Sequence, residues 1–225
     1  MSSAKVLSVN LARPRVEPEY TKSAGFRTGI DKRPAAGPVR VAAPGPKGTA
    51  DSGLEGDFIG DKVHHGGDDQ AVYAFAREDL DRWAEVLGRE LPAGAFGENL
   101  TTAGVDVNDA RIGERWRIGP DLVIEATSPR IPCRTFAGWL GERGWVRRFT
   151  QDAAPGAYFR VLTPGRIAAG DALEVVHRPD HEVSVAFFFR AVTTAPELRP
   201  RVGAAGSALH VEAREQARKW AAEGS

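Results

Sequence analysis

The chain has 225 residues, 42% hydrophobic and 27% charged, a balance typical of a globular protein with a substantial core. Its 30 lysines and arginines offset 30 aspartates and glutamates, so no net charge draws it to nucleic acid or to an anionic membrane. A single cysteine excludes an internal disulfide, and the start of the chain has no signal-peptide core, so we expect a cytoplasmic protein. Its most apolar run, 185–189, is far shorter than the roughly 20 residues of a membrane helix. A small-molecule ligand is therefore expected.

Short strand-like runs recur between glycines and prolines, a pattern that favours a sandwich or a barrel over a helical bundle. In the run 122–127, Leu122, Ile124 and Ala126 share one face, as in a half-buried strand. This strand delivers the chain to the only cysteine, Cys133. The predicted strands are 6–11, 39–42, 71–75, 115–118, 122–127, 158–162 and 173–176.

Two helices interrupt the strand pattern. Between residues 77 and 91, apolar residues recur at spacings of three and four, and Pro92 follows the last of them. The segment 209–222 carries a second apolar stripe, which ends at Trp220. Both stripes predict helices that pack one face against a core.

A polar break at 177–181 marks the point where helix-type spacing replaces strand-type spacing. We therefore predict two parts, a β domain of residues 1–178 and a small helical module of residues 179–225. The aromatic run 187–189 is expected to dock this module on the β domain, because most aromatic clusters belong to cores. Docking on a second subunit is the alternative, so the sequence predicts a monomer or a homodimer.

Cys133 lies in a rigid, basic segment. Pro129 and Pro132 fix the backbone on its N-terminal side, and Arg130 and Arg134 add positive charge, which favours the thiolate where it points at the sulfur. The thiolate is the form of cysteine that attacks carbon or binds metal. The alternative is a free cysteine that merely fills the core, but prolines and arginines in a turn favour the functional interpretation.

The segment 61–70 is the second candidate. Gly66 and Gly67 can place backbone N–H groups in a concave nest that His65 completes as an anion or cofactor site, although a tight turn between strands explains the glycines equally well. His64 and His65 are adjacent, so in a strand they point apart, and the spaced ligands of a zinc site are missing. We therefore expect no structural zinc.

The segment 94–102 is the third candidate. It sets the polar residues Glu98 and Asn99 between buried-type Phe96 and Leu100. Polar side chains in such loops more often cap and orient neighbouring backbone than touch a ligand. Asn99 alone is retained as a candidate for ligand binding.

Taken in order, these segments resemble the MOSC (molybdenum cofactor sulfurase C-terminal) domain, in its small stand-alone bacterial branch. The resemblance runs from about residue 6 to residue 176, and the tail is similar to the three-helix module of that branch. It implies a mainly β (α+β) fold, a strongly bent β-barrel with a few helices, in agreement with the strand pattern. The blocks that carry it are 53–57, 65–67, 96–100, 129–133, and 164–165 with 170–171.

The resemblance implies the molybdenum cofactor, Mo-molybdopterin, with Cys133 as the protein's thiolate ligand to the metal. A soft thiolate suits a thiophilic metal, and cationic and backbone N–H donors suit an anionic cofactor. Arg160 ranks below Arg130, because a strand arginine is often ordinary surface. The residues expected to bind the cofactor are Thr28, Lys32, His65, Gly66, Gly67, Asn99, Arg130 and Arg160.

The resemblance further implies reduction of N-hydroxylated compounds, namely N-hydroxylated purine bases and hydroxylamines. His65 and Asp69 are the nearest candidate proton donors by sequence. The chain has neither an iron–sulfur cysteine set nor a dinucleotide fingerprint, so we expect an external flavin- or iron–sulfur-containing reductase to deliver electrons. Two positions depart from the family pattern: Gln70, where many relatives have a basic residue, and Glu114, where aspartate is usual.

Other uses of the same cysteine remain open. Cys133 with His65 can form the nucleophile and base of a hydrolase or transferase, if a third group orients the histidine. A low-pKa thiol can also carry a persulfide to a sulfur acceptor. Finally, the chain can hold a pterin as a carrier and catalyse nothing.

Overall fold

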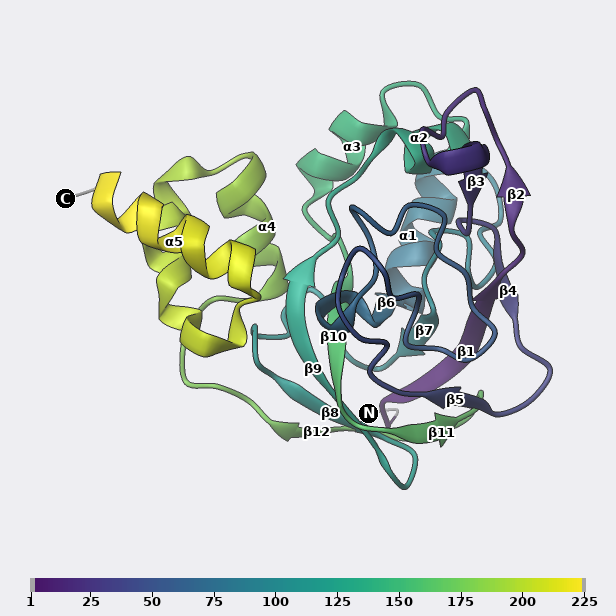
Figure 1. Ribbon diagram of the computed structural model, residues 1–225, viewed down its shortest axis with the longest axis horizontal. Helices are drawn as coiled ribbons and strands as arrows, with labels where there is room; N and C mark the ends of the chain where they lie inside the picture. The colour runs from purple at the N-terminus through teal and green to yellow at the C-terminus, as the bar shows by residue number, and fades with distance from the viewer. Residues whose placement is uncertain (1–2, 224–225) are drawn as a thin grey trace.

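A computed structural model describes residues 3–223 of the chain. A bent, mixed sheet of eight strands forms its centre, helices α1, α2 and α3 pack at one side, and α4 and α5 lie together at the other (Figure 1). Neighbouring strands are antiparallel except β6 and β7, which run parallel. In order across the sheet the strands are β12 (Leu173–His177), β8 (Arg115–Ile118), β9 (Leu122–Pro129), β10 (Ala157–Thr163), β6 (Val72–Ala76), β7 (Leu100–Ala103), β1 (Lys5–Ala12) and β4 (Lys32–Pro34).

Two small sheets flank the large one, and helices fill the long connections. The small sheets pair β5 (Val39–Val41) with β11 (Gly165–Ile167) and β2 (Arg15–Val16) with β3 (Arg27–Thr28). The α-helices are α1 (Arg77–Leu87), α2 (Arg134–Leu140), α3 (Trp145–Asp152), α4 (Val185–Thr193) and α5 (Val211–Glu223). The 3-10 segments are η1 (Ala24–Phe26), η2 (Asp68–Gln70) and η3 (Pro196–Ala208).

The mainly β, α+β class is confirmed, but the barrel is not closed. A bridge between Lys5 and Ala172, with the N–H of Val6 donating to the carbonyl of Asp171 (2.9 Å), brings β1 beside the start of β12. Among the described residues no ladder joins β12 to β4, the two ends of the strand order. The sheet therefore curves strongly and stays open along one edge.

Each predicted strand is present with small shifts at its ends. The end of β9 differs most from the prediction: the strand continues to Pro129 because Ser128 and Pro129 still pair with β10. The prediction missed β7, whose residues follow the polar pair Glu98 and Asn99 and were assigned to a loop. Its polar threonines are buried between β1 and β6, so its hydrophobic pattern is weak.

The predicted helix 77–91 is present as the shorter α1. It ends at Leu87 because Gly88 takes a left-handed φ of 64°, and the Gly88 N–H turns back to the carbonyl of Glu85. Leu80 and Trp83, the first two residues of the apolar stripe, are buried as expected. The sequence analysis did not recognise Gly88 as the residue that ends this helix.

The C-terminal part contains three helical segments, α4, η3 and α5, and α5 corresponds to the predicted helix 209–222. Phe187, Phe188 and Phe189 are all buried, and Phe188 belongs to the same apolar cluster as the sheet residues Trp116 and Phe159. The aromatic run thus docks the helices on the sheet. The division at residue 179 stays a prediction, and the outermost residues of the two predicted parts lie outside the described range. No helix between residues 3 and 223 is long and apolar enough to cross a membrane.

Candidate active site

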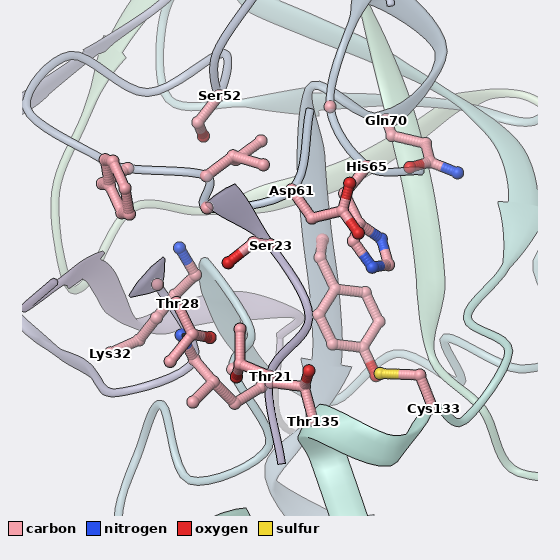
Figure 2. Close-up of a pocket in the computed structure, with 18 of the residues that line it drawn as sticks. Thr21, Ser23, Thr28, Lys32, Ser52, Asp61, His65, Gln70, Cys133 and Thr135 are labelled. Carbon is pink, nitrogen blue, oxygen red and sulfur yellow. Dashed lines mark hydrogen bonds between the residues drawn. The ribbon is translucent and has the colours of Figure 1, made fainter. Parts of the chain in front are cut away.

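A pocket of about 130 Å³ opens where the β3–β4 region, the 58–70 loop, β10 and the start of α2 meet. Figure 2 shows Cys133, His65 and Gln70 on one side of it and Thr28 and Lys32 on the other. Of the residues predicted from the sequence, the fold brings together at this pocket Thr28, Lys32, His65, Gly66, Asn99, Arg130 and Cys133. It leaves outside the pocket wall Gly67, Asp69 and Arg160.

Cys133 is half-buried and occupies the N-cap of α2. Burial by itself raises the pKa of the thiol, but a hydrogen bond with the His65 side chain, the charge of Arg130 and the backbone N–H of Phe136 lower it more strongly. The pKa of Cys133 falls from 9.0 to about 6. The pocket therefore presents a thiolate at neutral pH.

This thiolate predicts a measurable titration. We expect the rate of Cys133 alkylation by iodoacetamide in metal-free protein to rise with pH through a midpoint near 6, because the lowered pKa keeps the thiolate present above that pH and lost below it. His65→Ala should move the midpoint upward, since the hydrogen bond is lost. His64→Ala is the matched control, because the His64 ring is exposed and pairs with Asp61 at 2.9 Å. A wild-type midpoint above pH 8, or one that His65→Ala leaves in place, contradicts this geometry.

Arg130 places a fixed positive charge beside the sulfur. The residue is 6% exposed, its guanidinium donates to the carbonyl of Phe96, and it stacks 3.7 Å from the centre of the Phe136 ring. Within residues 3–223 no carboxylate forms an ion pair with it, so its charge stays available to the thiolate and to an anionic ligand. Arg134, by contrast, donates to the carbonyl of Glu19 and is not among the main causes of the lowered pKa of Cys133, so of the two arginines Arg130 is the one that acts chiefly on the sulfur.

Lys32 is neutralised by Asp57, which was not among the predicted site residues. Its Nζ lies 2.6 Å and 2.7 Å from the two oxygens of Asp57, which is almost fully buried, and Asn99 donates to the same carboxylate at 2.8 Å. Burial raises the pKa of Asp57, yet the Lys32 ammonium holds it below its ordinary value. Lys32 and Asn99 thus line the pocket as one hydrogen-bonded unit with Asp57.

The segment 64–67 combines two exposed or pocket-facing histidines with two glycines in left-handed backbone conformations. Gly66 lines the pocket with a φ of 81°, and Gly67 follows with a φ of 77°, where a Cβ would lie 2.6 Å from the backbone N of Lys47. Both positions therefore require glycine. His65 faces Cys133, while the His64 ring is exposed and pairs with Asp61; the segment that carries them is a turn and not the strand that the prediction considered. Thr28 lies on the far wall, where its Oγ accepts from the N–H of Ile30 at 3.2 Å.

Asp69 and Arg160 lie together behind the pocket wall. Their side chains form an ion pair of 2.9 Å, and Arg160 also donates to the carbonyl of Ala208 at 2.9 Å, which ties β10 to the C-terminal segment. Held by Arg160, Asp69 does not line the pocket. His65 is thus the predicted proton donor that the fold places beside the cysteine.

The donor set fits the molybdenum cofactor. A soft thiolate and an unpaired cation converge on one pocket, and two pocket residues, Thr21 and Gln70, have buried side-chain oxygens that lack a hydrogen-bond partner. These oxygens suit a polar ring system. No group of three or more His, Cys, Asp or Glu side chains within the described chain is arranged to hold a metal.

Sequence reasoning missed other groups in this pocket. Tyr73 and Tyr158 line it beside Arg130 and Cys133, and burial raises the pKa of both phenols. Thr21 comes from a loop without a recognisable motif. The two tyrosines lie in strands, where an aromatic residue predicts core packing rather than a site.

Comparisons with known proteins agree with this arrangement. A family model described as the MOSC domain matches residues 61–174. The chain is 38% identical over 182 residues to the uncharacterized protein YflK of Bacillus subtilis, covering 81% of this chain and 77% of YflK. It is 29% identical over 124 residues to a protein of Gibberella moniliformis named reductase, covering 54% of this chain and 22% of that protein.

A solved structure extends the match over nearly the whole chain. The crystal structure of YiiM from Geobacillus stearothermophilus is similar to this fold with a TM-score of 0.74 and 27% identity, covering 96% of this chain and 98% of YiiM. The family model spans the segments that carry His65 and Cys133, and the YflK match extends well beyond it. The chain belongs to the MOSC domain family.

Proposed function

We propose that this protein holds the molybdenum cofactor through Cys133 and reduces N-hydroxylated compounds. The observation that carries the proposal is the thiolate itself, with a pKa of about 6, in a pocket where Arg130 supplies an unpaired positive charge. A thiolate is the protein ligand that a thiophilic metal prefers. Membership of the MOSC family supports the cofactor, and the fungal relative that is named reductase supports an oxidoreductase.

Different pocket residues would bind different parts of the cofactor. Cys133 would bind the metal, Arg130 would offset negative charge near it, and the unpartnered oxygen of Thr21 would receive a polar group of the pterin. Gly66 would let the cofactor approach the backbone closely. When bound, the cofactor supplies two-electron chemistry to the N–O bond.

The overall reaction consumes two electrons and two protons. The N–O bond breaks, one proton adds to the nitrogen to give the amine, and the other adds to the leaving hydroxyl oxygen, which departs as water. His65, beside Cys133, is placed to donate a proton to the leaving oxygen and to recover one from solvent. An external reductase with a flavin or an iron–sulfur centre provides the electrons. N-hydroxylated purine bases and hydroxylamines are the proposed substrates.

Turnover by loaded protein tests the proposal. We expect protein produced in a host that makes molybdopterin to convert N-hydroxyadenine to adenine when a chemical or enzymatic reductant is present. Adenine formation is followed by liquid chromatography, and molybdenum is quantified in the same sample. Protein that contains molybdenum and pterin yet leaves both N-hydroxyadenine and hydroxylamine unchanged would be a carrier, contrary to the proposal.

A second candidate function rests on the same cysteine. The hydrogen bond between His65 and Cys133 favours a cysteine hydrolase or transferase, but in the described structure the nearby Asp61 carboxylate pairs with the ring of His64 and not with that of His65. Metal-free protein that cleaves an ester or amide would support this second function. An added sulfur on Cys133 in the mass spectrum would instead support a persulfide carrier.

A further inference from the structure

A second cavity adjoins the Cys133 pocket. It has a volume of about 480 Å³ and lies between the end of β9 and the helices α4 and α5. Gln70 lines both cavities, and Figure 2 shows it beside His65 at the edge of the Cys133 pocket. A volume of roughly 300–1,000 Å³ is usual for small-molecule sites. The C-terminal helices therefore build one wall of a cavity that shares Gln70 with the Cys133 pocket.

Polar atoms in this second cavity lack partners. Ser128 is only 5% exposed and its Oγ has no hydrogen bond, and the buried Oε1 of Gln70 has none either. Buried polar atoms are nearly always paired in folded proteins, so these two point to a ligand that pairs them. His210 adds a donor, because the N–H of Ala213 donates to its Nδ1 at 3.3 Å and leaves the proton of the neutral ring on Nε2.

Apolar and aromatic side chains form the rest of the wall. Phe188 comes from α4, Ile131 from the loop before Cys133, and Trp220 from the stripe of α5 that faces the sheet. Ile131 is 49% exposed, although it lies between two prolines in a fixed loop. The Arg199 guanidinium lies 5.5 Å from the centre of the Trp220 ring and orients the indole. A flat ring is the ligand that such a wall favours.

The charged residues of the cavity wall determine which planar ligands the cavity favours. Glu212 lines the cavity, and within the described chain no lysine or arginine does. Glu212 is paired with Lys47 at 3.2 Å, so the wall offers a phosphate group no free cation, and a free base fits better than a nucleotide.

We infer that this second cavity binds the planar heteroaromatic ring of the substrate as a free base, paired by Ser128 and Gln70 and packed on Trp220, with the N-hydroxyl group directed toward Cys133. The inference rests on the proposed reductase function and adds the ring-binding site, which the C-terminal helices complete. Purine-type rings satisfy it, because their edges carry both donors and acceptors.

Adenine titration of the purified full-length chain without metal tests the site directly. Calorimetry is expected to show adenine binding to the wild type and at least about fivefold weaker binding to Trp220→Ala and to Ser128→Ala, because stacking on an aromatic side chain is a main source of base affinity. Lys219→Ala is the matched control on the same helix, exposed and outside the cavity, and should bind like the wild type. AMP is expected to bind more weakly than adenine.

A second readout separates this inference from the proposed function. In molybdenum-loaded protein, Trp220→Ala should lower the ratio of kcat/KM for N-hydroxyadenine to kcat/KM for hydroxylamine about fivefold or more, chiefly through KM, with unchanged molybdenum content. Wild-type protein that fails to bind adenine, an unchanged ratio and affinity in Trp220→Ala, or AMP binding as tight as adenine overturns the inference, even where N-hydroxyadenine is reduced. Protein that binds adenine in this cavity but never acquires molybdenum contradicts the reductase function instead.

Discussion

Cys133→Ser is expected to lower the molybdenum content of the protein at least about 100-fold, since loss of groups that only support metal ligands already costs about 10–100-fold in metal affinity. The serine hydroxyl stays protonated near neutral pH and is a hard donor, whereas the Cys133 thiolate is soft and already formed above pH 6. Reduction of N-hydroxyadenine should fall in proportion. Molybdenum per chain, measured by mass spectrometry of the metal, is the readout.

The fold of this variant should survive. Cys133 is half-buried at the N-cap of α2, where serine is a favoured residue, so we expect the free energy of unfolding to change by less than about 1 kcal/mol. Thr135→Ala is the matched control, because it alters the same pocket wall without removing a sulfur. Wild-type molybdenum content in a folded Cys133→Ser protein removes the metal-ligand assignment.

Phe96→Ala is expected to lower the free energy of unfolding by about 3–5 kcal/mol, the usual cost of deleting a large buried aromatic ring. Phe96 is fully buried, and its ring centre lies 5.0 Å, 5.2 Å and 5.4 Å from those of Phe75, Phe136 and Trp145. The ring therefore joins β6 to α2 and α3. Urea denaturation measures the change, and the melting temperature should fall by about 10 °C.

The same change should weaken the site. The carbonyl of Phe96 accepts from Arg130, and Phe136 packs on both residues, so a collapse of this cluster loosens the cation beside Cys133. Val86→Ala, a change at a 57% exposed position of α1, is the control and should alter stability by no more than about 0.5 kcal/mol. A loss below 1 kcal/mol in Phe96→Ala would mean that the cluster is not packed as described.

Local pattern was sufficient for most strands of the large sheet, for α1 and α5, and to single out Cys133 and Arg130 as candidates. The alternation at 122–127 predicted β9, the apolar stripe predicted α1, and prolines around Cys133 indicated a fixed thiol beside Arg130. Each of these depends on residues close together in the sequence, where periodicity and backbone restriction act directly.

Pairings between distant segments could not be predicted in this way. Lys32 pairs with Asp57, 25 residues along the chain, and Asp69 pairs with Arg160, 91 residues along. No spacing rule predicts contacts at such separations. The sequence therefore does not reveal that Lys32 is neutralised or that the Asp69 carboxylate points away from the pocket. The seven-residue helix α2 is also too short for an apolar period to stand out.

The ring-binding cavity shows the same limit. In the sequence, Ser128 is indistinguishable from an ordinary strand residue, and Trp220 is one position of an apolar helical stripe. Only the docking of α4 and α5 against β9 places the two side chains around one cavity beside Gln70.

Crystals of molybdenum-loaded protein give the most direct test of whether the Cys133 sulfur binds the metal. An anomalous difference map recorded at the molybdenum absorption edge is predicted to show one strong peak within bonding distance of that sulfur, with pterin density reaching toward Thr28 and Gly66. A molybdenum peak elsewhere in the molecule, or a thiol packed against hydrocarbon with no metal beside it, would contradict the account.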